Sequence, residues 1–253
     1  MRDINEEVIN DDKAAAISLS SFSSFVDTFP LQGQAIYMAL FERHSNIVQT
    51  QKEKFAVANL EKILSATFEI SSTSGFEKMS LRDLSKRTGM SMGAIYSCIS
   101  KKEDIAMMVA DVVRLSSRLT QQHGLLAKSE WSQIKESIRF HLYASSLLQP
   151  WYFFLYFETR SLPEAQQQKS KNIELEAIKD FQKKIEAGVS SKEFFTDNAK
   201  MVANMIVVML EDWYLKPWKN YSIGTHKQSL DQQEQRIEAY CQSMTSMLRK
   251  ILT

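Results

Sequence analysis

Residues 75–105 read GFEKMSLRDLSKRTGMSMGAIYSCISKKEDI, and this stretch decides the fold. Ser80 is followed three positions later by Asp83, which is the spacing of a capping box at the start of a helix. That helix can run only to Gly89, and Ser91 then caps a second short helical segment. Two short helices joined by a tight turn predict a helix-turn-helix.

The second helix of this motif has an inner and an outer face. Leu84 lies on the inner face of the first helix, and Ile95 and Ile99, four positions apart, can pack against it. The outward residues are small or able to form hydrogen bonds, as a helix needs if it is to approach base edges in a major groove. These outward residues are Met92, Gly93, Ala94, Tyr96 and Ser97.

Positive charge is concentrated around this motif. The formal net charge of the chain is only +1, so the composition as a whole does not indicate a nucleic-acid-binding protein. Basic pairs nevertheless flank the motif: Lys86 and Arg87 on one side, Lys101 and Lys102 on the other. The backbone amides at the helix start after Ser80 can also hold phosphates. We therefore expect a local surface that binds DNA.

The rest of the chain is predicted to be helical. It has 253 residues with only 7 glycines and 4 prolines, and few strong helix breakers in a chain this long predict an all-α fold. We expect a polar, flexible tail over 1–32, an extra N-terminal helical segment over 33–54, the helix-turn-helix domain over 55–105 and a second domain over 106–253. Amphipathic helices are expected over about 130–148, 151–162, 164–187, 196–216 and 229–251.

Several classes of protein are disfavoured by the sequence. The acidic N-terminus has no apolar core of a signal peptide, and no apolar run approaches the roughly 20 residues of a membrane span, so we expect a cytoplasmic protein without a membrane partner. Cys98 and Cys241 lie far apart, without the spacing of a zinc site. No catalytic constellation stands out, so we expect neither an enzyme nor a cofactor.

The segments 63–68, 75–84, 88–96 and 102–105 together resemble, in register, the N-terminal signature of TetR-type transcriptional repressors. The resemblance implies an N-terminal three-helix helix-turn-helix DNA-binding domain, followed by a larger helical domain that binds a ligand and dimerises. It also implies that the protein binds a palindromic operator in double-stranded DNA as a homodimer.

The resemblance assigns roles to individual residues of the motif. Ser80 and Tyr96 match phosphate-contacting positions, and Lys102 matches a phosphate-binding lysine at the start of the next helix. Ser91, Met92, Ala94 and Ser97 match the face that meets the bases or the groove edge. One departure is Met92, because a lysine or arginine is common there. The alternative for Tyr96 is a tyrosine that only packs as a hydrophobic staple.

The second domain has an aromatic interior. Residues 151–158 are apolar all round, which predicts a helix surrounded by protein, and the alternative to a ligand pocket is a plain core. We expect an apolar or amphipathic effector, with a fatty acyl compound as one candidate, because 211–218 loosely resembles family members that answer to such compounds. The expected ligand-binding residues are His141, Trp151, Phe154, Phe157, Glu158, Trp213 and Tyr214.

Two apolar stripes near the end of the chain suggest the dimer interface. In the family that the motif resembles, the last two helices pair with those of a second copy as a four-helix bundle. The alternative is that the stripes serve the core of their own chain. The expected interface residues are Val202, Ile206, Trp213, Tyr240, Met244 and Met247.

These expectations combine into one functional hypothesis. The chain is a ligand-responsive DNA-binding regulator, a repressor that its effector releases from the operator. The alternative is an all-helical scaffold or interaction protein that keeps the fold without specific DNA binding. The near-neutral charge and Met92 are the features that favour this alternative.

Overall fold

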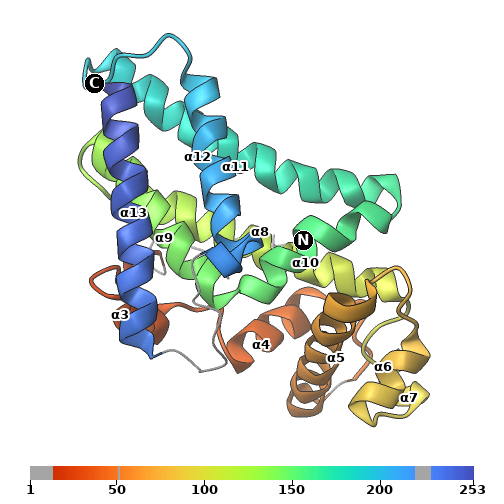
Figure 1. Ribbon diagram of the computed structural model, residues 1–253. Helices are drawn as coiled ribbons and strands as arrows, with labels where there is room; N and C mark the ends of the chain where they lie inside the picture. The colour runs from red at the N-terminus through yellow and green to blue at the C-terminus, as the bar shows by residue number, and fades with distance from the viewer. Residues whose placement is uncertain (1–13, 51, 220–228) are drawn as a thin grey trace. The chain divides into compact units, whose positions relative to one another are not determined.

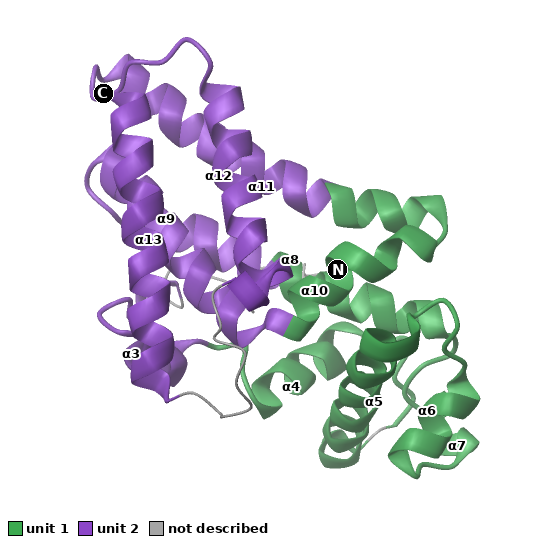
Figure 2. Ribbon diagram, in the orientation of Figure 1, with its two compact units in different colours: residues 1–8, 30–114, 150–171 green, residues 9–29, 115–149, 172–253 purple. Residues whose placement is uncertain are grey.

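The computed structural model describes residues 14–50, 52–219 and 229–253. All regular structure in these ranges is helical, without a strand, which confirms the all-α prediction (Figure 1). The chain divides into two compact units (Figure 2). Unit 1 contains 30–114 and 150–171, and unit 2 contains 14–29, 115–149 and 172–253.

Unit 1 is built around one long helix. The helix α5 packs against α4, α6 and α7, and it buries Leu60, Leu64 and Leu84 between them. It ends at Gly75, whose φ of 82° belongs to the region that glycine adopts without strain. The helices of this part are α4 (Gln34–Arg43), α5 (Glu53–Ser74), α6 (Leu81–Thr88), α7 (Met92–Tyr96) and the first part of α8 (Lys102–Gly124).

A second stretch of chain completes unit 1. It contains α10 (Gln149–Glu158) from residue 150 onward, the short 3-10 helix η1 (Thr159–Ser161) and the beginning of α11 (Glu164–Ser190). The predicted domain boundary at residue 105 therefore differs from the boundary of the unit. Unit 1 continues along α8 to residue 114, and α10 belongs to it although it is remote in sequence.

Unit 2 contains the later helices of the chain. It holds α9 (Glu130–Leu147), α12 (Ala199–Leu215), the 3-10 helix η2 (Pro217–Lys219), α13 (Leu230–Leu252) and most of α11. The helix α9 packs against both α12 and α13. The helix α11 runs through Gly188, where the sequence predicted its end. The ring of Phe194 lies so close to Gly188 that a Cβ on residue 188 would overlap it, so this glycine serves packing and not helix termination.

The N-terminal segment differs from the predicted tail. Residues 1–13 lie outside the described residues, but α3 (Phe22–Thr28) packs against α9 and α13 of unit 2. Phe22, Phe25 and Phe29 are almost fully buried. The reason is aromatic packing, because Phe25 lies 5.2 Å edge-on from Phe140 and 5.3 Å from Tyr143. Residues 14–29 therefore pack on unit 2 through their buried side chains and do not form a flexible tail.

In the ranges that the structure describes, no helix combines the length and the apolar character that crossing a membrane requires.

Candidate nucleic-acid interface

The helix-turn-helix is formed as the sequence predicts. Ser80 Oγ accepts a hydrogen bond from Asp83 N at 3.2 Å, and Asp83 Oδ2 accepts one from Ser80 N at 2.9 Å. These bonds complete the capping box. The Ser80 hydroxyl also donates to Asp83 Oδ2 at 2.6 Å, and this bond, together with the one from Ser80 N, lowers the pKa of Asp83. Gly89 turns the chain with a φ of 69°, and Ser91 Oγ accepts from Ala94 N at 3.2 Å to start α7. Both helix starts and the turn are confirmed.

The helix α7 has one buried and one exposed face. Ile95 is fully buried under it, whereas Ser91 and Gly93 are exposed and Met92 is half-buried. Tyr96 is 49% exposed, and its ring forms no stacking contact among the described residues. This exposure leaves Tyr96 available for contact outside the chain.

Ser97 has partners that the sequence did not indicate. Its carbonyl accepts hydrogen bonds from Gln49 N at 2.8 Å and Thr50 N at 3.3 Å. Thr50 Oγ1 donates to Ser97 Oγ at 3.0 Å, and Ser97 Oγ donates to Ala94 O at 2.8 Å. The segment that precedes α5 is therefore fastened to the end of α7, and Ser97 holds it there.

The basic side chains around the motif are not equally available. Lys86 and Lys101 are exposed, but the Nε of Arg87 donates to Glu69 Oε2 at 2.7 Å, so the charge of Arg87 is largely compensated. An open groove of about 540 Å³ lies beside α6 and carries further positive charge from Lys78. Its lining residues are Ile70, Ser74, Lys78, Met79, Asp83, Lys86 and Arg87.

Lys102 is engaged inside unit 1. Its Nζ donates to the carbonyl of Glu77 at 2.6 Å and to those of Phe76 and Met79 at 3.3 Å each. The ammonium also lies 5.3 Å from the centre of the Phe76 ring. An ammonium has three donors, and all three have acceptors here. Lys102 thus fixes the turn between α5 and α6, a role that the phosphate assignment did not include.

Four of the predicted ligand residues lie on α10 in unit 1. Phe154 packs edge-on against Phe76 at 4.9 Å, and Trp151 packs against Phe68 at 5.1 Å. Phe157 lies beside its helix neighbour Phe153, with ring centres 4.5 Å apart and the rings tilted. The contacts of Phe154 and Trp151 join α10 to the turn before α6 and to α5.

Glu158 at the end of α10 makes the same connection through a hydrogen bond. Its Oε2 accepts from the backbone N–H of Phe76 at 2.8 Å. A carboxylate that accepts from a backbone amide forms one of the stronger hydrogen bonds in proteins. The residue expected to orient a ligand head group therefore holds the turn before α6.

The other three predicted ligand residues lie in unit 2. Trp213 Nε1 donates to Ser146 Oγ at 2.9 Å, and its ring lies 5.0 Å from Tyr240. The ring of Tyr214 lies 6.1 Å from that of His141, whose pKa burial lowers to about 4. The seven predicted ligand residues are thus divided between the two units.

Most of the predicted interface residues belong to the core of their own chain. Val202, Ile206 and Met244 are buried, and so is Trp213. Tyr240 is half-buried, and its hydroxyl donates to Met209 O at 2.6 Å. Only Met247 among them is exposed. The other large apolar residues exposed on these two helices are Met201, Val208, Leu230 and Ile251.

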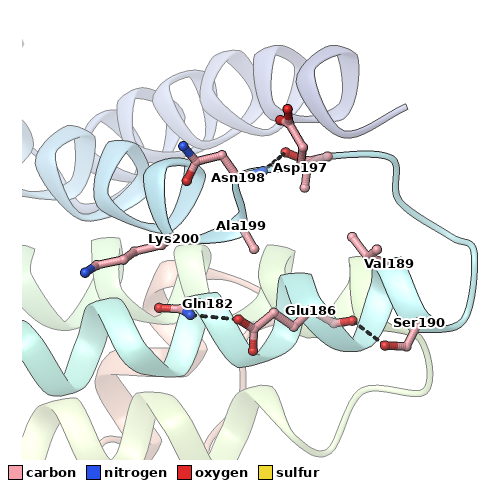
Figure 3. A pocket seen from close by; sticks show the side chains of 9 residues that line it. Gln182, Glu186, Val189, Ser190, Asp197, Asn198, Ala199 and Lys200 are labelled. Atoms are coloured by element: carbon pink, nitrogen blue, oxygen red, sulfur yellow. Dashed lines mark hydrogen bonds between the residues drawn. The ribbon is translucent and has the colours of Figure 1, made fainter.

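A polar pocket opens between the end of α11 and the start of α12 (Figure 3). Its volume is about 410 Å³. Gln182 donates to Glu186 within it at 2.7 Å, and most of its lining is polar or charged. This lining does not suit an apolar ligand. The residues around it are Gln182, Glu186, Val189, Ser190, Thr196, Asp197, Asn198, Ala199 and Lys200.

Comparison with known proteins identifies similar structures. No protein-family model and no curated protein sequence matches the chain. Solved structures do match. A bacterial regulatory protein of the TetR family from Rhodococcus RHA1 has a TM-score of 0.61 and 16% identity, over 75% of this chain and 96% of that chain.

Two further neighbours have the same architecture. The TetR family transcriptional regulator PfmR from Thermus thermophilus has a TM-score of 0.58 and 16% identity, over 72% of this chain and 93% of its own. The transcriptional regulator FadR from Bacillus subtilis, in complex with stearoyl-CoA, has a TM-score of 0.56 and 16% identity, over 74% and 96%. At such identities the likeness establishes the fold.

Proposed function

We propose that this chain, which has the fold of TetR-type transcriptional regulators, binds double-stranded DNA through α6 and α7 and controls transcription in response to a small molecule. The observation that carries the proposal is the capped pair α6–α7, which buries Ile95 and leaves Ser91, Gly93 and Tyr96 exposed. A short helix with small exposed residues at its start can approach base edges in a major groove.

The surroundings of α7 support a phosphate-binding rim. Lys78, Lys86 and Lys101 are exposed around the motif, and Tyr96 presents a hydroxyl at the end of α7. Phosphate contacts supply affinity and register, while contacts of α7 with base edges supply sequence preference. Lys102 acts in this scheme by holding the turn that carries Ser80.

A homodimer would supply the second copy of α7 that a palindromic operator requires. The residues suited to the interface are the apolar ones that the structure leaves exposed, not those it buries. Met201 and Val208 lie seven positions apart on α12, and Met247 and Ile251 lie four apart on α13. Spacings of this kind put each pair on one helix face.

The effector is proposed to be apolar or amphipathic. The Bacillus subtilis neighbour holds stearoyl-CoA, and unit 2 of this chain contains an aromatic interior with polar groups at Ser146 and His141. Trp213 and Tyr214 are the residues proposed to contact such a molecule. Binding can alter DNA affinity only if the effector prefers one of two conformations.

The helix α10 is proposed to couple effector and DNA. At its first residue, Gln149 Nε2 donates to Tyr214 O in unit 2 at 3.3 Å. At its other end, Glu158 accepts from Phe76 N in unit 1. The two bonds stand at the opposite ends of one helix of ten residues.

Selection of duplex DNA from a random library by the purified chain tests the function. We expect recovery of a two-fold symmetric sequence, whose binding weakens as salt rises because phosphate contacts release counterions. Tyr96→Ala should weaken binding without lowering the melting temperature, whereas Tyr156→Ala, an exposed tyrosine on α10, should leave binding unchanged. Absence of any salt-dependent DNA binding would support the scaffold alternative instead.

Repression is tested separately. A reporter gene placed behind the selected sequence should be silenced by the chain and released when an effector is supplied. Activation of the reporter by the chain would overturn the repressor assignment without affecting DNA binding.

A further inference from the structure

We propose that Lys52 and Lys54, which lie outside the helix-turn-helix, form a second phosphate-binding element of the DNA surface. The inference rests on the proposed function and extends it to the segment before α5. Its basis is the set of hydrogen bonds that fastens Gln49 and Thr50 to Ser97, the residue that ends α7.

Several hydrogen bonds join the segment before α5 to the end of α7. Two backbone N–H groups, of Gln49 and Thr50, converge on the one carbonyl of Ser97. The two hydroxyls of Thr50 and Ser97 add a third bond at 3.0 Å. The thiol of Cys98, which is buried, also has Thr50 and Asn59 beside it, and Asn59 belongs to the second turn of α5. The start of α5 is therefore held at the end of α7.

This arrangement brings positive charge close to the exposed end of α7. Lys52 follows Thr50 by two residues, so its Cα lies within about 7–8 Å of that of Thr50. Lys52 and Lys54 are both exposed, and neither forms an ion pair within the part of the chain that the structure describes. Tyr96, the proposed phosphate-contacting residue of α7, adjoins Ser97 on the other side of the fastening.

The position determines what the lysines can contact. The N-terminal residues of a recognition helix reach base edges, whereas its far end lies nearer the groove wall and the phosphate backbone. A flexible lysine serves as a point charge for a phosphate rather than as a reader of sequence. Lys52 and Lys54 should therefore add affinity equally for any duplex sequence.

Glu53 lies between the two lysines and provides a test within the same segment. It is exposed, and a carboxylate in the first turn of α5 stabilises the start of the helix. Next to a phosphate its charge is repulsive. Glu53→Gln should therefore raise DNA affinity, most at low salt where the repulsion is least screened, in the opposite direction to replacement of the lysines.

The experiment compares the double variant Lys52→Gln/Lys54→Gln with the wild-type chain. Binding is measured by fluorescence anisotropy on the selected 30-base-pair duplex and on a scrambled duplex, from 50 to 200 mM salt. Each lost contact reduces the slope of log affinity against log salt by about 0.9, so two contacts reduce it by about two for each protomer. Over this fourfold range of salt, the double variant should therefore lose about twelvefold less affinity than the wild-type chain for each protomer.

The effect should be the same on both duplexes, so the ratio of their affinities should not change. The matched control is Lys179→Gln/Lys183→Gln, two exposed lysines on α11, which should leave the slope unaltered. An unchanged slope for the Lys52/Lys54 variant, with Tyr96→Ala still impaired, would overturn the inference and leave the proposed function standing. A changed affinity ratio would also overturn it, because it would assign base reading to these lysines.

Discussion

Unit 1 and unit 2 each contain a tryptophan packed among other rings, but the two clusters connect different elements. In unit 1, Trp151 and Phe154 of α10 contact Phe68 on α5 and Phe76 in the turn before α6. In unit 2, Trp213 contacts Tyr240 on α13 and donates to Ser146 on α9. The first cluster holds the helix-turn-helix in place, and the second joins the helices proposed to receive the effector.

The difference lies in the polar groups more than in the rings. The polar connections of the unit 1 cluster serve the backbone of a turn, because Phe76 N donates to Glu158 and Phe76 O accepts from Lys102. The unit 2 cluster has side-chain polar groups inside it, which a ligand can engage in place of the protein. Damage to the first should therefore affect DNA binding directly, whereas damage to the second should affect the response to an effector.

Phe154→Ala tests the structural role of the unit 1 cluster. Phe154 is 1% exposed, and removal of a buried phenylalanine ring costs about 3–5 kcal/mol. We expect this loss in urea unfolding, together with faster hydrogen exchange in peptides from α5, α6 and α7. Tyr156→Ala on the exposed side of α10 should change stability by less than about 0.5 kcal/mol. Undisturbed exchange in unit 1 would show that α10 does not support the helix-turn-helix.

The pH dependence of stability should distinguish the units, because His141 and Glu211 both lie in unit 2. Burial lowers the pKa of His141 to about 4 from an ordinary value of 6.5. Between these pH values the imidazole of His141 binds a proton in the unfolded chain but not in the folded one. The free energy of unfolding therefore falls, by on the order of 3 kcal/mol, as pH decreases from 6.5 to 4. Burial and the nearby Glu174 raise the pKa of Glu211 to about 7. The neutral carboxyl of Glu211 therefore contributes to the stability of the fold below pH 4.5, and this stabilisation is lost as pH rises to 7.

The two contributions oppose each other between pH 4.5 and 6.5, so single variants separate them. With Glu211→Gln, exchange protection in unit 2 should increase as pH rises from 4 to 6.5. With His141→Gln, it should decrease as pH rises from 4.5 to 7. Peptides around Trp151 should follow neither change. Equal responses of both units to these variants would refute the separation.

Glu158→Ala should have a smaller, local effect. It removes the acceptor of the Phe76 amide, and a hydrogen bond to a charged group contributes about 1.5–3 kcal/mol. Glu158→Gln keeps an oxygen acceptor and should recover part of the loss. The measurement is the exchange rate of the Phe76 amide by NMR. If alanine and glutamine gave the same rate, the carboxylate would not be holding this turn.

Trp213→Phe should have the smallest effect. It keeps the ring contact with Tyr240 and removes only the hydrogen bond to Ser146, which contributes about 1 kcal/mol. Ser146→Ala should cost a similar amount, and the double variant should cost less than the sum. Additive costs would mean that these two side chains do not interact in solution.

Local chemistry explains which parts were predictable. The caps at Ser80 and Ser91 and the turn at Gly89 follow from rules that act over three or four residues, so the sequence alone located the helix-turn-helix. The partners of Lys102 and Glu158 could not be found this way. They join the turn at Phe76 to residues 26 and 82 positions away, and no periodicity encodes such a pairing.

In the N-terminal segment, the sequence contained a helical pattern that its polar composition obscured. Phe22, Phe25 and Phe29 recur at the spacing of one helix face, but the serine-rich stretch over 18–24 favoured a flexible tail. One of these serines, Ser21, instead caps α3, because its Oγ accepts from Ser24 N at 3.0 Å. The burial of this face depends on partners that are remote in sequence, the rings of Phe140 and Tyr143 on α9 and the helix α13.

The packing of α3 also has a consequence for synthesis of the chain. Phe25 leaves the ribosome almost 120 residues before Tyr143, and at roughly 5–20 residues per second it waits about 6–24 seconds for that partner. The helices α5, α6 and α7 need mainly local contacts and can form in the meantime. During that interval three phenylalanine side chains of a nascent chain lack the helices α9 and α13 that bury them, and such exposed apolar surface favours chaperone binding and aggregation.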